Sequence, residues 1–296
     1  MKSIIWFRND LRIDDNPAMR AACDNSTEVY AIFLYSKDQL RKHNEANVKL
    51  DFLIENLNSL SDSLQKLNVP LLIMASSGFD ENPEIILKTA KEIDVDKIFF
   101  NKQLGEDEQK RDREVVSILE ASNITVESFN DQIVYEAGSI RTGQDNAYSV
   151  FTPFKRKWVE NFDMEFLDIE HKYIPMAQGS ISSNISSFNF DFKIEHKVDM
   201  SIWPTGEQAA LDRLKNFLEN KASNYSKDRN DPIIDGTSRM SPYLALGIIS
   251  SKRCILEGLK LNNFEFNSGN NGIIKWIDEI VWREFYRNIM FSFPKV

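Results

Sequence analysis

The chain begins with an apolar run, Ser3-Ile-Ile-Trp-Phe-Arg8, and a polar turn that ends at Asn16 and Pro17. Short runs of nearly continuous apolar character are typical of strands that are buried on both faces of a parallel sheet. Asn as the N-cap, followed by Pro at the first helical position, is a common way for a helix to start. We therefore predict a strand over residues 3–8 and a helix over residues 16–22.

The same alternation of strand and helix continues to about residue 130. Further strands are predicted over residues 29–35, 69–74, 97–100 and 124–129, with helices over 45–67, 83–93 and 107–121. Asn82 before Pro83 repeats the N-cap arrangement of Asn16 and Pro17. Because this order gives a parallel sheet with helices on both faces, we predict an α/β fold with a doubly wound parallel sheet.

The turn after the first strand, residues 8–16, contains no glycine. A pyrophosphate group could not approach that backbone closely, which excludes a nicotinamide-type Rossmann domain. The chain also lacks the G-x-x-x-x-G-K-[ST] pattern of a phosphate-binding loop. The predicted sheet is therefore Rossmann-like without the glycine fingerprint, and any nucleotide site must lie elsewhere or use other chemistry.

Beyond residue 130 the sequence pattern changes twice. From 131 to 200 it weakens into Ser, Asn, Gly and Asp, with one helical piece near 152–162, and Ser180–Ser187 looks least ordered. From residue 203 it becomes wholly helical, with helices predicted over 207–219, 242–249, 251–260 and 272–291. We therefore expect an α/β domain over residues 1–130, a connector over 131–200 and a helical domain over 201–296.

The composition indicates a globular protein of the cytoplasm. At 296 residues the chain is long enough for two domains, and its 42% hydrophobic and 27% charged content does not indicate disorder. No apolar run approaches the roughly 20 residues of a membrane span, and the apolar start is too short for a secretory signal. Cys23 and Cys254 lack C-x-x-C spacing and the histidines lie far apart, so we predict no disulfide and no metal site.

The formal net charge of -9 is unevenly distributed along the chain. Residues 1–220 contain 25 Lys and Arg against 37 Asp and Glu, whereas residues 221–296 contain 11 against 8. The net negative charge therefore does not exclude a nucleic-acid partner, because the helical part carries a modest basic excess.

The last predicted helix interleaves aromatic and charged residues in Trp276-Ile-Asp-Glu-Ile-Val-Trp-Arg-Glu-Phe-Tyr-Arg287. At helical spacing, one stripe contains Trp276, Glu279, Trp282 or Arg283, and Tyr286. The rest of the surface is largely apolar, so the helix is expected to be buried and its polar groups need partners, for example a planar ligand with polar edges. The alternative is a core helix whose indoles pack on a neighbour while Arg283 and Glu284 point to solvent.

Three motifs together resemble the DNA photolyase and cryptochrome family. Trp6-Phe-Arg-Asn-Asp-Leu-Arg12 with Asp15-Asn-Pro-Ala18 is similar to the family's opening W-F-R-x-D-L-R-x-x-D-N-P-A. Asp235-Gly-Thr-Ser-Arg-Met-Ser-Pro-Tyr-Leu-Ala245 resembles the flavin-binding T-S-x-L-S-P-x-L, with Met240 in the usual Leu position. The run from Trp276 is similar to W-x-x-E-L-x-W-R-E-F-Y, with Ile280 where Leu is usual. The chain looks most like a class I cyclobutane pyrimidine dimer photolyase that lacks its C-terminal part.

The second motif also makes physical sense as a seat for a diphosphate. Thr237 and Ser238 offer hydroxyl and backbone donors, and Arg239 offers a cation. Ser241 and Pro242 start a helix whose N-terminal amide groups favour an anion. The alternative is an ordinary helix start after a glycine turn.

The resemblance implies roles for individual residues. It implies FAD contacts for Tyr225, Thr237, Ser238, Arg239, Met240, Ser241 and Trp276. Residues that match positions facing damaged DNA are Glu279, Trp282, Arg283 and Tyr286, and Arg229 matches a phosphate-contacting position. Trp282 would stack on the flipped-out lesion, while Glu279 would hydrogen-bond its base edges and stabilise the radical anion. Without the family, Tyr225 is equally a surface phenol and Arg229 a solvated loop charge.

The implied reaction is light-driven repair of a cyclobutane pyrimidine dimer by electron transfer from reduced FAD. A folate (methenyltetrahydrofolate) antenna is implied by residues 101–112, in which Glu108 matches the family's carboxylate but Asp107 stands where Asn is expected. The alternative for this segment is a charged helix start after a strand. The lack of histidine in the helical part weighs against the (6-4) photoproduct as the lesion.

Two other functions stay open: a cryptochrome-like flavin photoreceptor, and a non-enzymatic remnant that is folded in its first domain. Members of the family continue far beyond the point where this chain ends. We therefore expect the chain by itself to bind FAD weakly or not at all, and to expose an aromatic stripe that favours association. The full-length protein is expected to be a monomer that binds DNA containing pyrimidine dimers.

Overall fold

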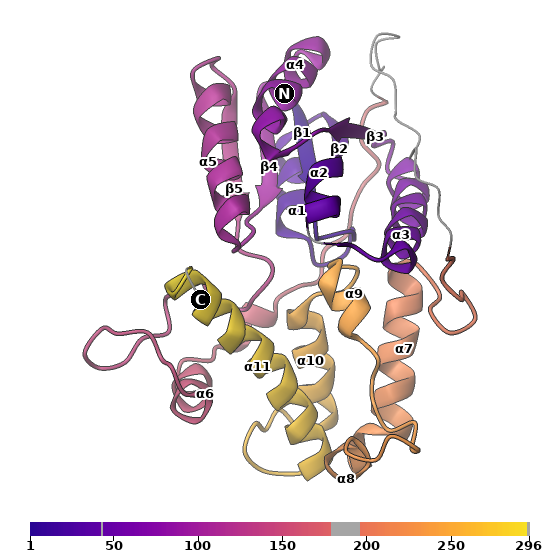
Figure 1. Cartoon of the computed structure of the whole chain (residues 1–296), viewed down its shortest axis with the longest axis vertical. Helices are drawn as coiled ribbons and strands as arrows, with labels where there is room; N and C mark the ends of the chain where they lie inside the picture. The colour runs from indigo at the N-terminus through magenta and orange to yellow at the C-terminus, as the bar shows by residue number, and fades with distance from the viewer. Residues whose placement is uncertain (43, 179–195, 295–296) are drawn as a thin grey trace. The chain divides into compact units, whose positions relative to one another are not determined.

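The computed structural model describes residues 1–42, 44–178 and 196–294 (Figure 1). The first unit contains Met1–Asp131 and His171–Glu207, and the second unit contains Gln132–Glu170 and Gln208–Val296. Residues 131–200, expected to form a connector, are thus shared between the two units, and Ser180–Ser187 lies outside the described residues. The division into domains at 1–130, 131–200 and 201–296 stays a prediction.

A parallel sheet forms the centre of the first unit. Its strands are β1 (Lys2–Phe7), β2 (Glu28–Ser36), β3 (Leu71–Ser76), β4 (Lys97–Asn101) and β5 (Thr125–Phe129). Their order is β3-β2-β1-β4-β5, and every pair of neighbours is parallel. The direction of winding reverses between β1 and β4, so the predicted doubly wound parallel sheet is confirmed.

The helices of this unit alternate with the strands as predicted. They are α1 (Pro17–Asn25), α2 (Lys37–Lys42), α3 (Asn47–Gln65), α4 (Asn82–Ile93) and α5 (Glu106–Glu120). Helix α2 was not predicted, because its six residues are mostly polar and show no apolar periodicity.

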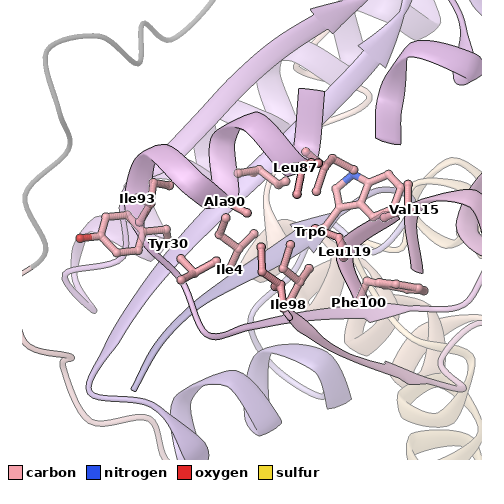
Figure 2. Close-up of a cluster of buried hydrophobic side chains, with 14 of the residues drawn as sticks. Ile4, Trp6, Tyr30, Leu87, Ala90, Ile93, Ile98, Phe100, Val115 and Leu119 are labelled. Carbon is pink, nitrogen blue, oxygen red and sulfur yellow. The ribbon is translucent and has the colours of Figure 1, made fainter. Parts of the chain in front are cut away.

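Both faces of the sheet are buried. On one face Ile4 and Trp6 of β1, with Phe100 of β4, belong to a core cluster that includes Ala90 of α4 and Leu119 of α5 (Figure 2). The intervening strand residues are also buried, namely Ile5, Phe7, Ala31 and Phe99. Burial on both faces explains why the central strands β1, β2 and β4 are nearly continuous apolar runs, whereas β5 at the edge of the sheet is only partly buried.

The two predicted N-caps have different outcomes. The Asn16 side-chain oxygen accepts a hydrogen bond of 3.0 Å from the Met19 amide, and Pro17 is the first residue of α1, as predicted. The prediction for Asn82 is wrong, because Asn82 is the first residue inside α4 and makes no cap. A 3₁₀ turn, η1 (Phe79–Glu81), runs directly into α4 and displaces the helix start by one residue.

The second unit is helical. Its elements are α6 (Phe151–Glu160), η2 (Met164–Leu167), α7 (Glu207–Asn220, of which Glu207 belongs to the first unit), η3 (Ala222–Asn224), α8 (Tyr225–Asp228), α9 (Ser241–Ala245), α10 (Ser251–Leu261) and α11 (Asn271–Ser292). The helix predicted over 242–249 is shorter than expected, because Gly247 adopts a left-handed backbone (φ 63°) that ends it. Among the described residues, no helix is long and apolar enough to span a membrane.

Helix α11 is the element around which the second unit is assembled. It begins at the N-cap Asn270, whose side chain accepts hydrogen bonds from the Gly272 and Ile273 amides. A Cβ atom at Gly272 would clash with the carbonyl oxygens of Ala222 and Ser223, so only glycine permits this close approach to η3. The helix also contacts α6, α8 and α10, which places the predicted aromatic stripe among several neighbours.

Candidate active site

The first turns of α11 join two predicted flavin contacts through a buried aromatic cluster. Trp276 is 2% exposed, and its ring lies 5.2 Å from that of Phe217 in α7. Phe217 in turn meets Tyr225 of α8 edge to face at 5.7 Å. Burial raises the pKa of the Tyr225 phenol. Tyr225 is thus not the surface phenol of the alternative interpretation, and Trp276 packs on a neighbour as a core indole does.

Glu279 and Arg229, for which the sequence suggests different roles, are directly paired. The Arg229 guanidinium donates a hydrogen bond to the Glu279 carboxylate, and this bond raises the pKa of Arg229. The Arg229 guanidinium also lies 5.4 Å from the centre of the Tyr225 ring. The two charged side chains are 32% and 37% exposed, so both can reach a ligand from where they stand. Tyr225, Arg229 and Glu279 therefore form one continuous group.

Trp282 lies one turn further along α11 in a stack of aromatic rings. Its ring lies 3.7 Å from that of Phe151, with an angle of 10° between the planes, and 5.5 Å from that of Tyr286. Tyr286 is 62% exposed, whereas Trp282 is partly buried. Phe151 was not considered from the sequence, because the predicted helix began one residue later, at Thr152.

Arg283 and Glu284 do not point to solvent, so that part of the alternative core-helix interpretation is wrong. Arg283 donates hydrogen bonds to the backbone carbonyls of Gln132 and Leu244. Glu284 is 0% exposed, and its two carboxylate oxygens lie 2.9 and 3.0 Å from the amide nitrogen of Val134. The Ser251 hydroxyl donates to the same carboxylate at 3.3 Å. Both side chains bind the segment that follows residue 131, which packs on this side of α11.

Burial raises the pKa of Glu284 to about 7, and the hydrogen bond from the Val134 amide opposes this rise. A carboxyl group with so strongly shifted a pKa is often a catalytic group, but such shifts also occur in structural networks. Here the donors are a backbone amide and a serine of the protein itself, which indicates a structural role. The sequence did not show that Glu284 is buried, since the partner segment lies about 150 residues away in the chain.

The predicted diphosphate seat follows α8 in the second unit. A Cβ atom at Gly236 would clash with Asp228, so this glycine lets the segment approach the end of α8 closely. Arg239 has a left-handed backbone (φ 52°) and forms an ion pair of 2.9 Å with Asp235. The hydrogen bond from Lys221 lowers the pKa of the Asp235 carboxyl.

The donors of this seat are accessible. Thr237, Arg239 and Ser241 are exposed, Ser238 is partly buried, and Met240 is buried at 2% exposure. Ser241 and Pro242 are the first two residues of α9, as predicted, although α9 is only five residues long. Hydroxyl groups and a guanidinium group are thus placed near a helix start, where an anion would be favoured.

Glu108, the predicted antenna contact, lies in the first turn of α5 in the first unit. The Glu108 carboxylate folds back over Gly105. Burial lowers the pKa of Arg8 to about 10, and nearby negative charges, including that of Glu108, oppose this fall. The guanidinium groups of Arg8 and Arg111 lie over the Trp6 ring at 4.2 and 4.8 Å. These side chains fill the carboxyl ends of β1 and β4, where doubly wound sheets commonly bind ligands. Asp107 pairs with Lys42 at 3.3 Å.

Comparison with known proteins identifies the family. Residues 3–174 match the family model described as DNA photolyase, and the chain belongs to that family. The deoxyribodipyrimidine photo-lyase of Buchnera aphidicola subsp. Acyrthosiphon pisum is 33% identical over 304 residues, which cover 100% of this chain and 61% of that protein.

Solved structures of similar fold agree with this membership. A bacterial class III photolyase from Agrobacterium tumefaciens superposes with a TM-score of 0.78 at 25% identity. The match covers 99% of this chain and 60% of the photolyase chain. A cryptochrome from Synechocystis sp. PCC6803 gives a TM-score of 0.79 at 21% identity, with 99% and 62% covered, and supports the fold alone. The chain thus spans about three fifths of the length of the relatives that it matches.

Proposed function

We propose that this chain acts in light-driven repair of cyclobutane pyrimidine dimers in DNA, as a deoxyribodipyrimidine photo-lyase with bound FAD. The observation that carries the proposal is the grouping of Tyr225, Arg229 and Glu279 beside Trp282 on α11. Tyr225 and Arg229 lie about 50 residues before Glu279 in the chain, and the second unit brings the three side chains together. A relative of that name at 33% identity, with 100% of this chain covered, supports the same activity.

The residues of the second unit fit a flavin dinucleotide. The exposed hydroxyl groups of Thr237 and Ser241, with the Arg239 guanidinium, would hold a diphosphate, because they offer donors and positive charge near the start of α9. Tyr225 would border the ring system at the edge of the aromatic cluster, whereas Trp276, at 2% exposure, would support that edge from within the core. When bound, reduced FAD supplies the electron that light releases, while the protein supplies position and charge.

Glu279 and Trp282 would receive the lesion. A carboxylate held in place by Arg229 can accept hydrogen bonds from the N–H edges of the bases, and an indole offers a flat face for stacking. A DNA phosphate would compete with Glu279 for Arg229. Binding of the DNA backbone would therefore release the Glu279 carboxylate from Arg229. Arg283 and Tyr286 complete the proposed DNA-facing set. Tyr286 is its most exposed side chain, whereas Arg283 would have to exchange the carbonyl oxygens of Gln132 and Leu244 for DNA.

The remaining parts of the proposal concern the antenna, the location in the cell, the oligomeric state and the affinity for FAD. A methenyltetrahydrofolate antenna would be held in the first unit by Glu108, in the first turn of α5. The protein would be cytoplasmic, and this chain by itself would associate and would bind FAD weakly or not at all. Size-exclusion chromatography with light scattering, with and without FAD, measures the oligomeric state directly.

A light-dependent repair assay tests the proposal. The chain is mixed with reduced FAD in large excess, so that weak binding does not hide activity, and with an oligonucleotide that contains one thymine dimer. Illumination should split the dimer into two thymines faster with the chain than with FAD alone. A Glu279→Gln variant should split it no faster than FAD alone. Equal rates with and without the chain would refute the proposal. An absorption spectrum after dialysis shows separately whether the chain retains FAD.

A further inference from the structure

Trp282 is surrounded by aromatic rings that come from two helices. From α11 it meets Phe285 edge to face at 5.7 Å and Tyr286 nearly parallel at 5.5 Å. From α6 it meets Phe151 with ring centres 3.7 Å apart and planes 10° apart. The contact with Phe151 is therefore a close face-to-face stack, and it covers one face of the indole.

Helix α6 is fixed to α11 along the face that carries Phe151. Phe151, Phe154, Lys155 and Trp158 lie on one side of α6, at spacings of three and four residues. Phe154 contacts Phe285 at 5.3 Å, and the Lys155 ammonium pairs with the buried Asp278 carboxylate at 2.5 Å. These contacts hold the start of α6, and with it Phe151, in a defined place against α11.

The other end of α6 is held as firmly. Trp158 is 0% exposed, and its backbone carbonyl accepts a hydrogen bond of 2.8 Å from the Tyr135 hydroxyl. The first turn of α6, in contrast, has no side-chain N-cap, since Val150 is the residue before it. The contacts of Phe154 and Lys155 with α11 therefore hold this turn in place, and the stack of Phe151 on Trp282 restrains both rings.

A restrained indole matters for stacking on a base. A tryptophan on a partly exposed helix face can change its rotamer, and it would then lose the orientation that a base must meet. With Phe151 against one face, that face of the ring is covered, and a base would have to meet the other face. Binding then needs no reordering of the ring, which is the general benefit of preorganisation.

We propose that Phe151 is a positioning residue, which holds the Trp282 indole in the orientation in which its opposite face stacks on the flipped-out pyrimidine dimer. This inference rests on the proposed function, and it adds a residue from α6 to a site otherwise assigned to α8, α9 and α11. The chemical requirement at position 151 is a flat aromatic ring, because only a flat ring fits the narrow space beside the indole. Leucine would fill part of the volume without restraining the ring.

Binding of two single-stranded oligonucleotides tests the role of Phe151. One contains a single thymine dimer and the other has the same sequence without damage, and Kd is measured for each by fluorescence anisotropy in the dark with excess FAD. In Phe151→Ala and Phe151→Leu the preference for the damaged strand should fall about tenfold, the size of one lost base-stacking contact. Phe151→Tyr should restore the preference, and undamaged DNA should bind with unchanged affinity. An unchanged or greater preference in the Ala and Leu variants would overturn the proposal.

A spectroscopic measurement separates this inference from the proposed function. The near-UV circular dichroism of Trp282 is obtained as the difference between each protein and its Trp282→Phe counterpart. The Trp282 signal should be strong with Phe or Tyr at position 151 and should collapse with Ala or Leu, while far-UV spectra stay the same. If the wild-type chain does not prefer the damaged strand, the proposed function fails, and the Trp282 signal still decides whether Phe151 holds the ring. A signal that persists with Ala and Leu overturns the inference.

Discussion

Two neighbouring turns of α11 each carry a glutamate, and the surroundings of the two side chains are opposite in character. Glu279, with a side chain that is 37% exposed, faces the cation Arg229. Glu284 is 0% exposed and accepts hydrogen bonds from the Val134 amide and the Ser251 hydroxyl. A carboxylate that is partly exposed and held by one cation can exchange that partner for a ligand. A buried carboxylate whose donors belong to the protein cannot do so without breaking the packing around it.

A strongly shifted pKa on α11 therefore does not by itself mark the site. Burial raises the pKa of Glu284 to about 7, yet the residue that the family resemblance assigns to the lesion is Glu279. Glu284 instead fastens the segment after residue 131 to α11, and this segment leads into α6 and Phe151. Glu279 thus stays a proposed contact of the lesion, whereas Glu284 supports the elements around it.

The largest expected effect is the pH dependence that Glu284 gives to stability. Its pKa rises from 4.5 in the unfolded chain to about 7 in the folded protein, so the folded state binds the proton more tightly. The contribution of Glu284 to stability is then greatest below pH 4.5, falls as pH rises towards 7, and is lost above that. The loss should be about 3 kcal/mol across this window, because each tenfold difference in proton affinity between the folded and unfolded states corresponds to about 1.4 kcal/mol.

Urea unfolding at several pH values checks this effect, with Glu284→Gln as the matched control. The free energy of unfolding of the wild type should fall relative to that of the Gln variant as pH rises, because glutamine does not titrate. Parallel profiles for the two proteins would show that Glu284 titrates normally and would remove the contrast with Glu279.

Truncation of Glu284 should have the next largest effect. In Glu284→Ala the Val134 amide loses its acceptor in a buried place and the Ser251 hydroxyl loses a partner, which costs about 2 kcal/mol. Urea unfolding at about pH 6, where the wild-type carboxyl is largely protonated, measures this loss. Glu279→Ala is the control and should cost less than about 1 kcal/mol, since its ion pair is exposed. Equal losses for the two variants would contradict the assigned roles.

The sequence predicted some of these features and could not predict others, for physical reasons. The sheet was predictable because a strand buried on both faces must be apolar throughout, as in β1 and β4. The α11 stripe was predictable from its helical period, and Trp276 and Glu279 lie on it as expected. The burial of Glu284 was not predictable, since periodicity within α11 does not show that residues around Val134 pack there. Phe151 was missed because helix ends are poorly defined in sequence.

The smallest expected effect on stability, and the one that isolates the proposed site, concerns the pair of Arg229 and Glu279. A double-mutant cycle with Arg229→Ala and Glu279→Gln should give a coupling of about 0.5 kcal/mol in urea unfolding, because both side chains are about one-third exposed and water screens the pair. In the illuminated repair assay each single variant should instead lose most of the activity, since Glu279 would meet the bases and Arg229 would bind a DNA phosphate. A coupling above about 2 kcal/mol would place Glu279 with Glu284 as a structural residue. Full repair activity in Glu279→Gln would remove it from the site altogether.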